Sequence, residues 1–273
     1  VISGEQELTT HAALITFVSY LIGAELAGGA HLRDVGVAVL ITGISTNFIY
    51  SFNAWADRRI DAVNKPWRPI PAGQIKPEKA LVYSLLLLVI AVVYPFFIAR
   101  TLLTLALFEL LPLLGVLYSA KPFSFRRNAL LSTLTVSIGL ITPLMLGYFM
   151  HTLDEDLVPL FIGLFFFCIC VVPLKDIEDA EGDRSFGIRN FYLFWGSKLV
   201  LFSLVGLSID LVWISVAALP LILKILATTI MMATMVCILI FHFSRLNMRV
   251  MYRTIIWTII TLSIGLYLVI RWG

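Results

Sequence analysis

The sequence predicts an all-α, polytopic membrane protein in which nine transmembrane helices form a bundle around a central cavity. Of its 273 residues, 60% are hydrophobic and only 14% are charged, whereas a soluble domain is nearer half apolar and a quarter charged. The apolar residues form runs of about 20, the length that an α-helix needs to cross a bilayer. We therefore expect the lipid bilayer to be the main solvent, and we expect no nucleic-acid partner.

Each of the nine runs is expected to be one spanning helix, and residues 1–273 are expected to form a single transmembrane domain. The first run is not expected to be a signal peptide, because no basic segment or small-residue cleavage site accompanies it. Two boundaries are narrow: Arg100 alone separates the third and fourth runs, and residues 217–220 separate the seventh and eighth. The runs lie near residues 9–28, 34–54, 78–98, 101–119, 129–150, 156–174, 192–213, 218–243 and 250–271.

The basic residues indicate which side of the membrane each loop faces. Most of the 20 Lys and Arg residues lie in the segments that follow the second, fourth, sixth and eighth runs. Because cytoplasmic loops carry an excess of Lys and Arg, we expect these segments and the N-terminus to be cytoplasmic in a multi-pass protein of the cell membrane. The acidic segment 151–156 then falls on the opposite side and is expected to be a solvated turn.

Two acid-rich segments follow apolar runs on this cytoplasmic side, near residues 53–61 and 176–183. In the first, Asn53, Asp57 and Asp61 recur every four residues and share one face of a helix. Aspartates four apart repel each other on a bare helix, so two solvated helix ends explain the pattern poorly. The second segment also places three carboxylates on one face: Asp176, Asp179 and Asp183.

Carboxylates gathered twice beside a membrane are costly unless a cation neutralises them. Mg²⁺ prefers oxygen ligands and commonly binds one or two carboxylates together with substrate phosphates. Two acidic faces opposed across a bundle therefore predict a diphosphate held between them by Mg²⁺. Basic residues on the same side suit such an anion, one of them in a stiff, proline-rich segment over residues 65–73: Arg68, Lys121, Lys175 and Arg189.

These motifs resemble those of the UbiA-type intramembrane prenyltransferases. Residues 53–61 match the family pattern N-x-x-x-D-x-x-x-D, and residues 68–73 match R-P-I-P-[SA]-G. Residues 118–121 match a Y-S-x-K loop, and residues 175–189 match K-D-x-x-D-x-x-G-D-x-x-x-G-x-R. The chain departs from the family at Ala54, where many members have Asp, and at Asn190, where Thr is common. It also lacks the Arg-Pro-x-Asn element that often precedes the first helix.

The resemblance implies Mg²⁺-dependent transfer of a prenyl group from a prenyl diphosphate to a lipophilic acceptor, through an allylic carbocation. Asp176 is expected to accept the acceptor's proton or to orient Lys175, and Tyr50 to face the carbocation. The carboxylates expected to be catalytic are Asp57, Asp61, Asp176, Asp179 and Asp183. The expected metal ligands are Asp57, Asp61, Asp179, Asp183 and Asn53. The residues expected to bind substrate are Asn53, Arg68, Tyr118, Lys121, Lys175, Arg189 and Tyr50.

Within that family we expect a hydrophobic or aromatic acceptor, with an aromatic quinone precursor as the first hypothesis and a glycerophosphate lipid, for ether-lipid synthesis, as the alternative. A secondary transporter is a rival from another class, because two similar motifs four helices apart resemble an internal repeat. The polar groups, however, cluster at one face of the membrane and not at its midplane. A structural or receptor-like bundle is a further rival, and it predicts no dependence on a divalent ion.

Overall fold

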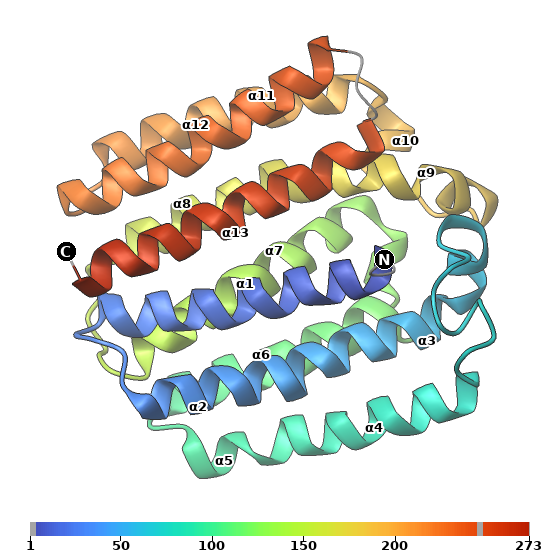
Figure 1. The fold of residues 1–273 in the computed structure, drawn as a ribbon, viewed down its shortest axis with the longest axis horizontal. Helices are drawn as coiled ribbons and strands as arrows, with labels where there is room; N and C mark the ends of the chain where they lie inside the picture. Colours follow the sequence, from blue (N-terminus) through green and yellow to red (C-terminus); the bar gives the residue numbers. More distant parts are fainter. Residues whose placement is uncertain (1–3, 245–247, 273) are drawn as a thin grey trace.

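The chain folds into a bundle of long helices that run back and forth along one axis (Figure 1). The computed structural model describes residues 4–244 and 248–272, and within them the side chains of residues 11–244 and 250–272. The helices are α1 (Gly4–Leu26), α2 (Leu32–Leu40), α3 (Asn47–Asn64), α4 (Pro77–Val93), α5 (Pro95–Ile98), α6 (Leu102–Ser119), α7 (Ala129–Phe149), α8 (Val158–Val171), α9 (Asp176–Ser185), α10 (Phe191–Trp195), α11 (Lys198–Val216), α12 (Leu221–Phe243) and α13 (Met248–Trp272). Short turns complete the chain: a π-helical segment η1 (Ile41–Thr46) and two 3₁₀ segments, η2 (Phe125–Arg127) and η3 (Val172–Lys175).

The structure confirms the predicted all-α membrane fold. Eight helical stretches within the described residues are long and apolar enough to cross a membrane, and α1 adds a shorter apolar stretch, His11–Leu26. Counted with α1, they correspond to the nine predicted spans. The seventh span was expected to start at residue 192, but α11 starts at Lys198. The break follows from Gly196, which has a φ of +56°, a conformation that glycine adopts without strain and that ends α10.

Two of the spans are composite helices, and both carry an acid-rich segment. Leu32–Asn64 joins α2, η1 and α3, while Val158–Ser185 joins α8, η3 and α9. A π-helical segment inside a long helix widens the backbone locally and is often found at functional sites. In both spans the acidic segment extends the helix beyond its apolar part, so it is presented at the end of the bundle.

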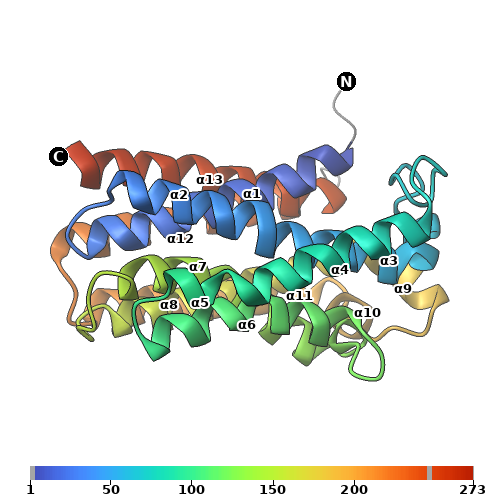
Figure 2. The same ribbon diagram turned by 90° about the horizontal axis from the view of Figure 1, so that it is seen from below.

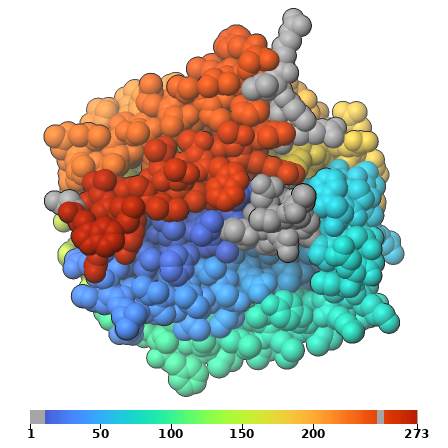
Figure 3. All heavy atoms as spheres, in the orientation of Figure 1, coloured from blue at the N-terminus to red at the C-terminus, as the bar shows by residue number. Residues whose placement is uncertain are grey.

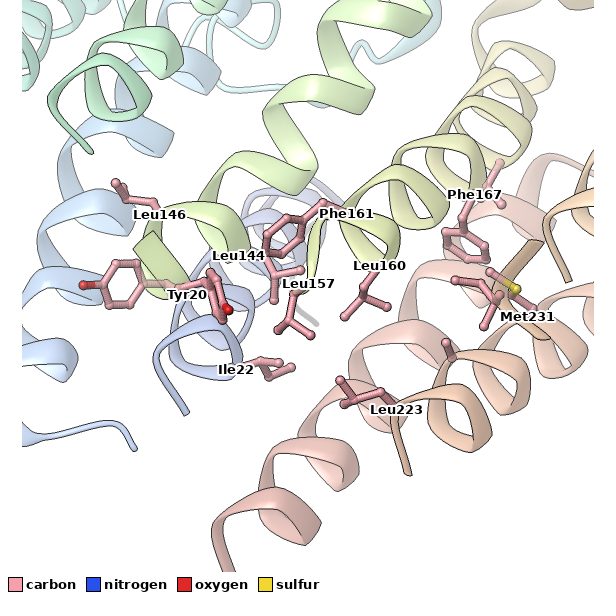
Figure 4. Close-up of a cluster of buried hydrophobic side chains, with 14 of the residues drawn as sticks. Tyr20, Ile22, Leu144, Leu146, Leu157, Leu160, Phe161, Phe167, Leu223 and Met231 are labelled. Atoms are coloured by element: carbon pink, nitrogen blue, oxygen red, sulfur yellow. The ribbon is translucent and has the colours of Figure 1, made fainter. Parts of the chain in front are cut away.

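The centre of the bundle is built on close contact between α1 and α7. A Cβ atom added to Gly23 would collide with the backbone of Leu144, and one added to Gly147 would collide with the backbone of Tyr20. Small residues of this kind allow two membrane helices to approach backbone to backbone. Tyr20 and Leu144 belong to a cluster of buried side chains that extends from α1 and α7 to α8 and α12 (Figure 4).

The two acidic segments emerge at the same end of the bundle. The C-terminal end of α3 and the whole of α9 lie beside each other there in both ribbon views (Figures 1 and 2). The connection between α7 and α8, which contains residues 151–156, lies at the opposite end. The fold thus brings together segments more than 100 residues apart in the sequence, and it keeps the third acidic segment away from them.

Candidate functional site

Asn64, the last residue of α3, connects the two acidic segments directly. Its side-chain nitrogen donates to the backbone carbonyl of Asp179 at 3.1 Å, and its side-chain oxygen accepts the backbone N–H of Gly182 at 2.6 Å. Lys65, the next residue, places its Nζ 2.7 Å from Oδ1 of Asp179. The end of α3 is therefore fixed against the first two turns of α9.

Arg126 lies between the two acidic faces and touches both. Its Nη1 forms an ion pair with Asp57, and its Nη2 lies 3.4 Å from Oδ1 of Asp183. Burial disfavours the charged guanidinium, but Asp57 and Asp183 outweigh that effect and raise the pKa of Arg126. Because one guanidinium reaches both carboxylates, the faces of α3 and α9 are opposed across a single side chain.

Asn53, Asp57 and Asp61 follow one another at successive turns of α3, as their spacing in the sequence predicts. Asn53 donates to Oδ2 of Asp57 at 2.6 Å, one helical turn away, and lies 3.4 Å from the hydroxyl of Ser119 on α6. Asp61, one turn further along, accepts a hydrogen bond from Nη1 of Arg68 at 2.6 Å. The proline-rich segment after α3 therefore folds back so that its Arg68 side chain contacts Asp61 of α3.

The second acidic face is supported by the segment that follows α9. Asp183 accepts a hydrogen bond from the side-chain amide of Asn190 at 2.8 Å. Asp176 accepts the backbone N–H of Phe191 at 3.0 Å and lies 3.1 Å from Nζ of Lys175. Asp176 is thus engaged by a cation and by the backbone, which fits the orienting role better than the proton-accepting one.

A short polar path runs from the second segment to α6. Nζ of Lys175 donates to the hydroxyl of Ser132 on α7 at 3.4 Å, and that hydroxyl lies 3.5 Å from the hydroxyl of Tyr118. Tyr50 lies within electrostatic reach of Tyr118, Arg68 and Lys175. The predicted substrate-binding residues Tyr50, Arg68, Tyr118 and Lys175 therefore lie in the same region of the structure.

An inner cavity with a mostly apolar lining lies in the membrane-spanning part of the bundle, between α1, α7, α8, α12 and α13. Its lining includes Tyr252 and also Val172, which precedes Lys175 by three residues. Tyr252 in turn is within electrostatic reach of Lys175 and Tyr50. Leu144, Leu160 and Phe167 line the cavity deeper in the bundle (Figure 4).

Two predicted substrate-binding residues are not brought into the cluster. Lys121 is exposed and lines a separate hollow, of about 600 Å³, together with Phe123 and Arg127. Arg189 is also exposed, and its segment is fixed by a backbone contact, in which its N–H donates to the carbonyl of Arg127 at 3.4 Å. In this arrangement neither side chain reaches the aspartates.

Sequence reasoning missed four residues that the structure places at the centre of the site. They are Asn64, Lys65, Arg126 and Asn190. Asn64 and Lys65 follow the first motif at the three- and four-residue spacing that extends its helical face, so periodicity contained a signal for them. Arg126 pairs with Asp57 and Asp183, which lie 69 and 57 positions from it in the sequence, so only the tertiary fold brings them together. Nothing in the local sequence distinguishes Arg126 from Arg127.

The side chains of the cluster can be weighed against what Mg²⁺ requires of its ligands. Within the described residues, no group of three or more Asp, Glu, His or Cys side chains converges closely enough to hold a metal ion. Instead, protein cations pair with the aspartates, and Nε of Arg126 is buried with no hydrogen-bond partner. Mg²⁺ commonly takes one or two carboxylates and completes its shell with phosphates and water. The donor set therefore fits Mg²⁺ that is shared with an anionic substrate, and not a site made by the protein alone.

Comparison with known proteins agrees with this geometry. Residues 12–269 match the model of the UbiA prenyltransferase family. A digeranylgeranylglyceryl phosphate synthase from Natronomonas pharaonis is 33% identical over 190 residues, which cover 68% of this chain and 66% of that protein. The chloroplastic chlorophyll synthase of Arabidopsis thaliana is 30% identical over 210 residues, covering 71% of this chain and 54% of that protein. The chain thus spans less than two thirds of the length of these relatives.

Solved structures show the same fold. A UbiA homologue from Archaeoglobus fulgidus, bound to GPP and Mg²⁺, superposes with a TM-score of 0.78 at 18% identity and covers 96% of both chains. A digeranylgeranylglyceryl phosphate synthase superposes with a TM-score of 0.63 at 18% identity, over 95% of this chain and 99% of the other. The family match extends over nearly the whole chain, and the fold and the paired acidic segments agree with it. The chain belongs to the UbiA prenyltransferase family.

Proposed function

We propose that this protein is an intramembrane enzyme that transfers a prenyl group from a prenyl diphosphate to the hydroxyl of a glycerophosphate lipid. The observation that carries the proposal is Arg126, which lies between Asp57 and Asp183 and keeps a buried Nε–H without a partner. A buried cation between two acidic faces, with donor capacity to spare, suits an anion that arrives together with divalent ions.

The chain's own residues would bind and orient the diphosphate. Asp57 and Asp61 on α3, with Asn53, and Asp179 and Asp183 on α9 would hold Mg²⁺. Bound Mg²⁺ would neutralise charge on the departing diphosphate. The cations that now pair with the aspartates would then be released toward phosphate oxygens: Lys65, Arg68 and Arg126.

The reaction itself exchanges one C–O bond for another. The bond between the first prenyl carbon and the diphosphate breaks, and the diphosphate keeps the electron pair. The allylic cation is then attacked by the acceptor's hydroxyl oxygen, which loses its proton to the medium or to the diphosphate. In this mechanism the apolar inner cavity, which Tyr252 lines, would exclude water from the cation, and the rings of Tyr50 and Tyr252 would stabilise its charge.

The acceptor is where the proposal departs from the first hypothesis drawn from the sequence. The aromatic quinone precursor receives no support from the relatives, because several of them are named digeranylgeranylglyceryl phosphate synthases. The glycerophosphate alternative is therefore preferred. The transporter hypothesis receives no support from a prenyltransferase family match. The excess of Lys and Arg in the loops at the site's end of the bundle favours placing the site at the cytoplasmic face.

The test is a transfer assay with the full chain in lipid nanodiscs. Radiolabelled geranylgeranyl diphosphate would be supplied with either a glycerophosphate monoether or a hydroxybenzoate, with and without Mg²⁺. We expect labelled diether only with the glycerophosphate acceptor and only with Mg²⁺. Preferential labelling of the hydroxybenzoate would contradict the acceptor, and Mg²⁺-independent transfer would contradict the site.

A further inference from the structure

A second apolar compartment reaches the site from the other side of α1. This α1–η1 groove, of about 640 Å³, is lined by Leu14 and Phe17 of α1 and by Val39, Gly43, Thr46 and Tyr50 of the composite span. The two helices that form it lie side by side on the face shown in Figure 3. From Val39 to Tyr50 it follows the helix for roughly 16 Å, at 1.5 Å per residue.

The groove ends at the reaction site. Val39, Gly43, Asn47 and Tyr50 follow one another at three- or four-residue spacing, so they form a stripe on the composite helix. The same spacing continues from Tyr50 to Asn53 and then to Asp57. A chain that lies along this stripe would therefore reach Tyr50, one helical turn from the acidic face.

The helix α1 separates the groove from the inner cavity. Leu14 and Phe17 face the groove, whereas Ile15 and Ile22 face the cavity. Both compartments lead toward the acidic end of the bundle: Tyr50 of the groove lies three residues before Asn53, and Val172, which lines the cavity, lies three residues before Lys175. An enzyme that joins two lipids needs two apolar compartments that lead to one reaction site.

The side chains that line the cavity and the groove indicate which substrate's apolar chain each of them binds. The inner cavity is almost wholly apolar and enclosed by five helices, which suits the chain that becomes a carbocation and must be kept from water. The groove is more open and carries polar groups, Thr42, Thr46 and Asn47. Gly43 leaves its middle unfilled, since a Cβ built there would have no atom within 4 Å.

We propose, on the basis of the proposed function, that the α1–η1 groove binds the apolar chain of the acceptor, so that the enzyme requires an acceptor that already carries a long chain of its own. A glycerophosphate monoether with an isoprenoid chain meets this requirement, and a free aromatic acid does not. The groove and the inner cavity then hold the two chains of the product on opposite sides of α1.

The test fills the groove with Gly43→Phe and uses Gly265→Phe as the matched control. Gly265 is also an exposed helical glycine with no atom within 4 Å of a built Cβ, but it lies on α13 outside the groove. Gly43→Phe should raise the KM for a glycerophosphate geranylgeranyl monoether by about tenfold, the loss expected when one or two methylene groups cannot be buried. The KM for a glycerophosphate propyl monoether and for geranylgeranyl diphosphate should not change, and Gly265→Phe should leave all three unchanged.

A direct binding measurement keeps this inference separate from the proposed function. A glycerophosphate isoprenoid monoether with a diazirine at the end of its chain would be photo-crosslinked to the full protein in nanodiscs. Labelling of α1 and η1 peptides that Gly43→Phe abolishes would support the proposal, even if no transfer to any acceptor were detected. Labelling of α8, α12 and α13 peptides, or an equal effect of Gly43→Phe on both acceptors, would overturn it.

Discussion

The side chain of Asn64 occupies the space that a side chain at Gly182 would need. A Cβ added to Gly182 would lie 2.5 Å from the amide atoms of Asn64, and the amide oxygen accepts the Gly182 N–H at 2.6 Å. The glycine in the second acidic segment is therefore required by the close approach of α9 to the end of α3. This contact sets the separation of the two acidic faces.

Gly182→Ala should displace the Asn64 amide or push α9 away from α3, and in either case it breaks the contact that fixes the two acidic faces. We expect prenyl transfer to fall by about 100-fold, because misplacement of binding groups by an ångström has effects of that size. Steady-state transfer assays would measure it, with Gly36→Ala on α2 as the control, since a Cβ at Gly36 has no atom within 4 Å. Full activity of Gly182→Ala would show that the contact between Asn64 and Gly182 is not needed to position the faces.

Arg126→Ala should remove the cation that links the two faces. We expect a loss of about 100-fold in kcat/KM, the scale seen when a charge-stabilising donor is removed from an active site. Arg127→Ala is the matched control, because Arg127 is the neighbouring residue but directs its Nη2 to the carbonyl of Phe186. Equal losses in the two variants would mean that Arg126 acts only through the fold of its loop.

Asp57→Asn and Asp183→Asn preserve shape but remove one negative charge from each face. If these carboxylates bind Mg²⁺, the concentration of Mg²⁺ that gives half-maximal activity should rise in both variants, and kcat should fall. Titration of activity with Mg²⁺ would measure the shift. Asp154→Asn, in the loop at the opposite end of the bundle, should leave the titration unchanged. An unshifted titration in Asp57→Asn would exclude that residue as a ligand.

Gly147→Ala tests the helix contact at the centre of the bundle. The added Cβ would collide with the backbone of Tyr20, so α1 and α7 must separate, at a cost of about 1–3 kcal/mol for overpacking. Thermal unfolding in detergent should show a lower Tm. Gly139→Ala on the same helix should be neutral, because its Cβ would meet only the Leu114 side chain, at 4.0 Å. Similar Tm values for both variants would contradict the close packing of α1 on α7.

The parts of this protein that follow from helical periodicity were predictable from the sequence. The spans are long apolar runs. Asn53 was expected to lie one helical turn from Asp57, and in the structure its side-chain nitrogen is 2.6 Å from Oδ2 of Asp57. The opposition of the two segments was inferred only from chemistry, since their contact depends on how the helices pack. For the same reason the position of Arg126 could not be predicted: its partners are supplied by α3 and α9.

The sequence motifs predicted which segments form the site better than they predicted which side chains point into it. Lys121 lies in a matched loop, yet its side chain faces a hollow on the outside of the cluster. Lys65 lies between matched segments, yet it pairs with Asp179. Which of two neighbouring cations turns inward depends on the direction of the backbone after the helix ends, and no short pattern encodes that direction.

The pairing of the aspartates with Lys65, Arg68 and Arg126 has a consequence for how the protein is made. Buried charges that lack partners are strongly destabilising, and many metalloproteins do not fold until their ion arrives. Here Asp179, Asp61 and Asp57 are paired with basic side chains of the same polypeptide. These pairs would stabilise the acidic end of the bundle before any divalent ion binds, so assembly in the bilayer would not have to wait for the ion.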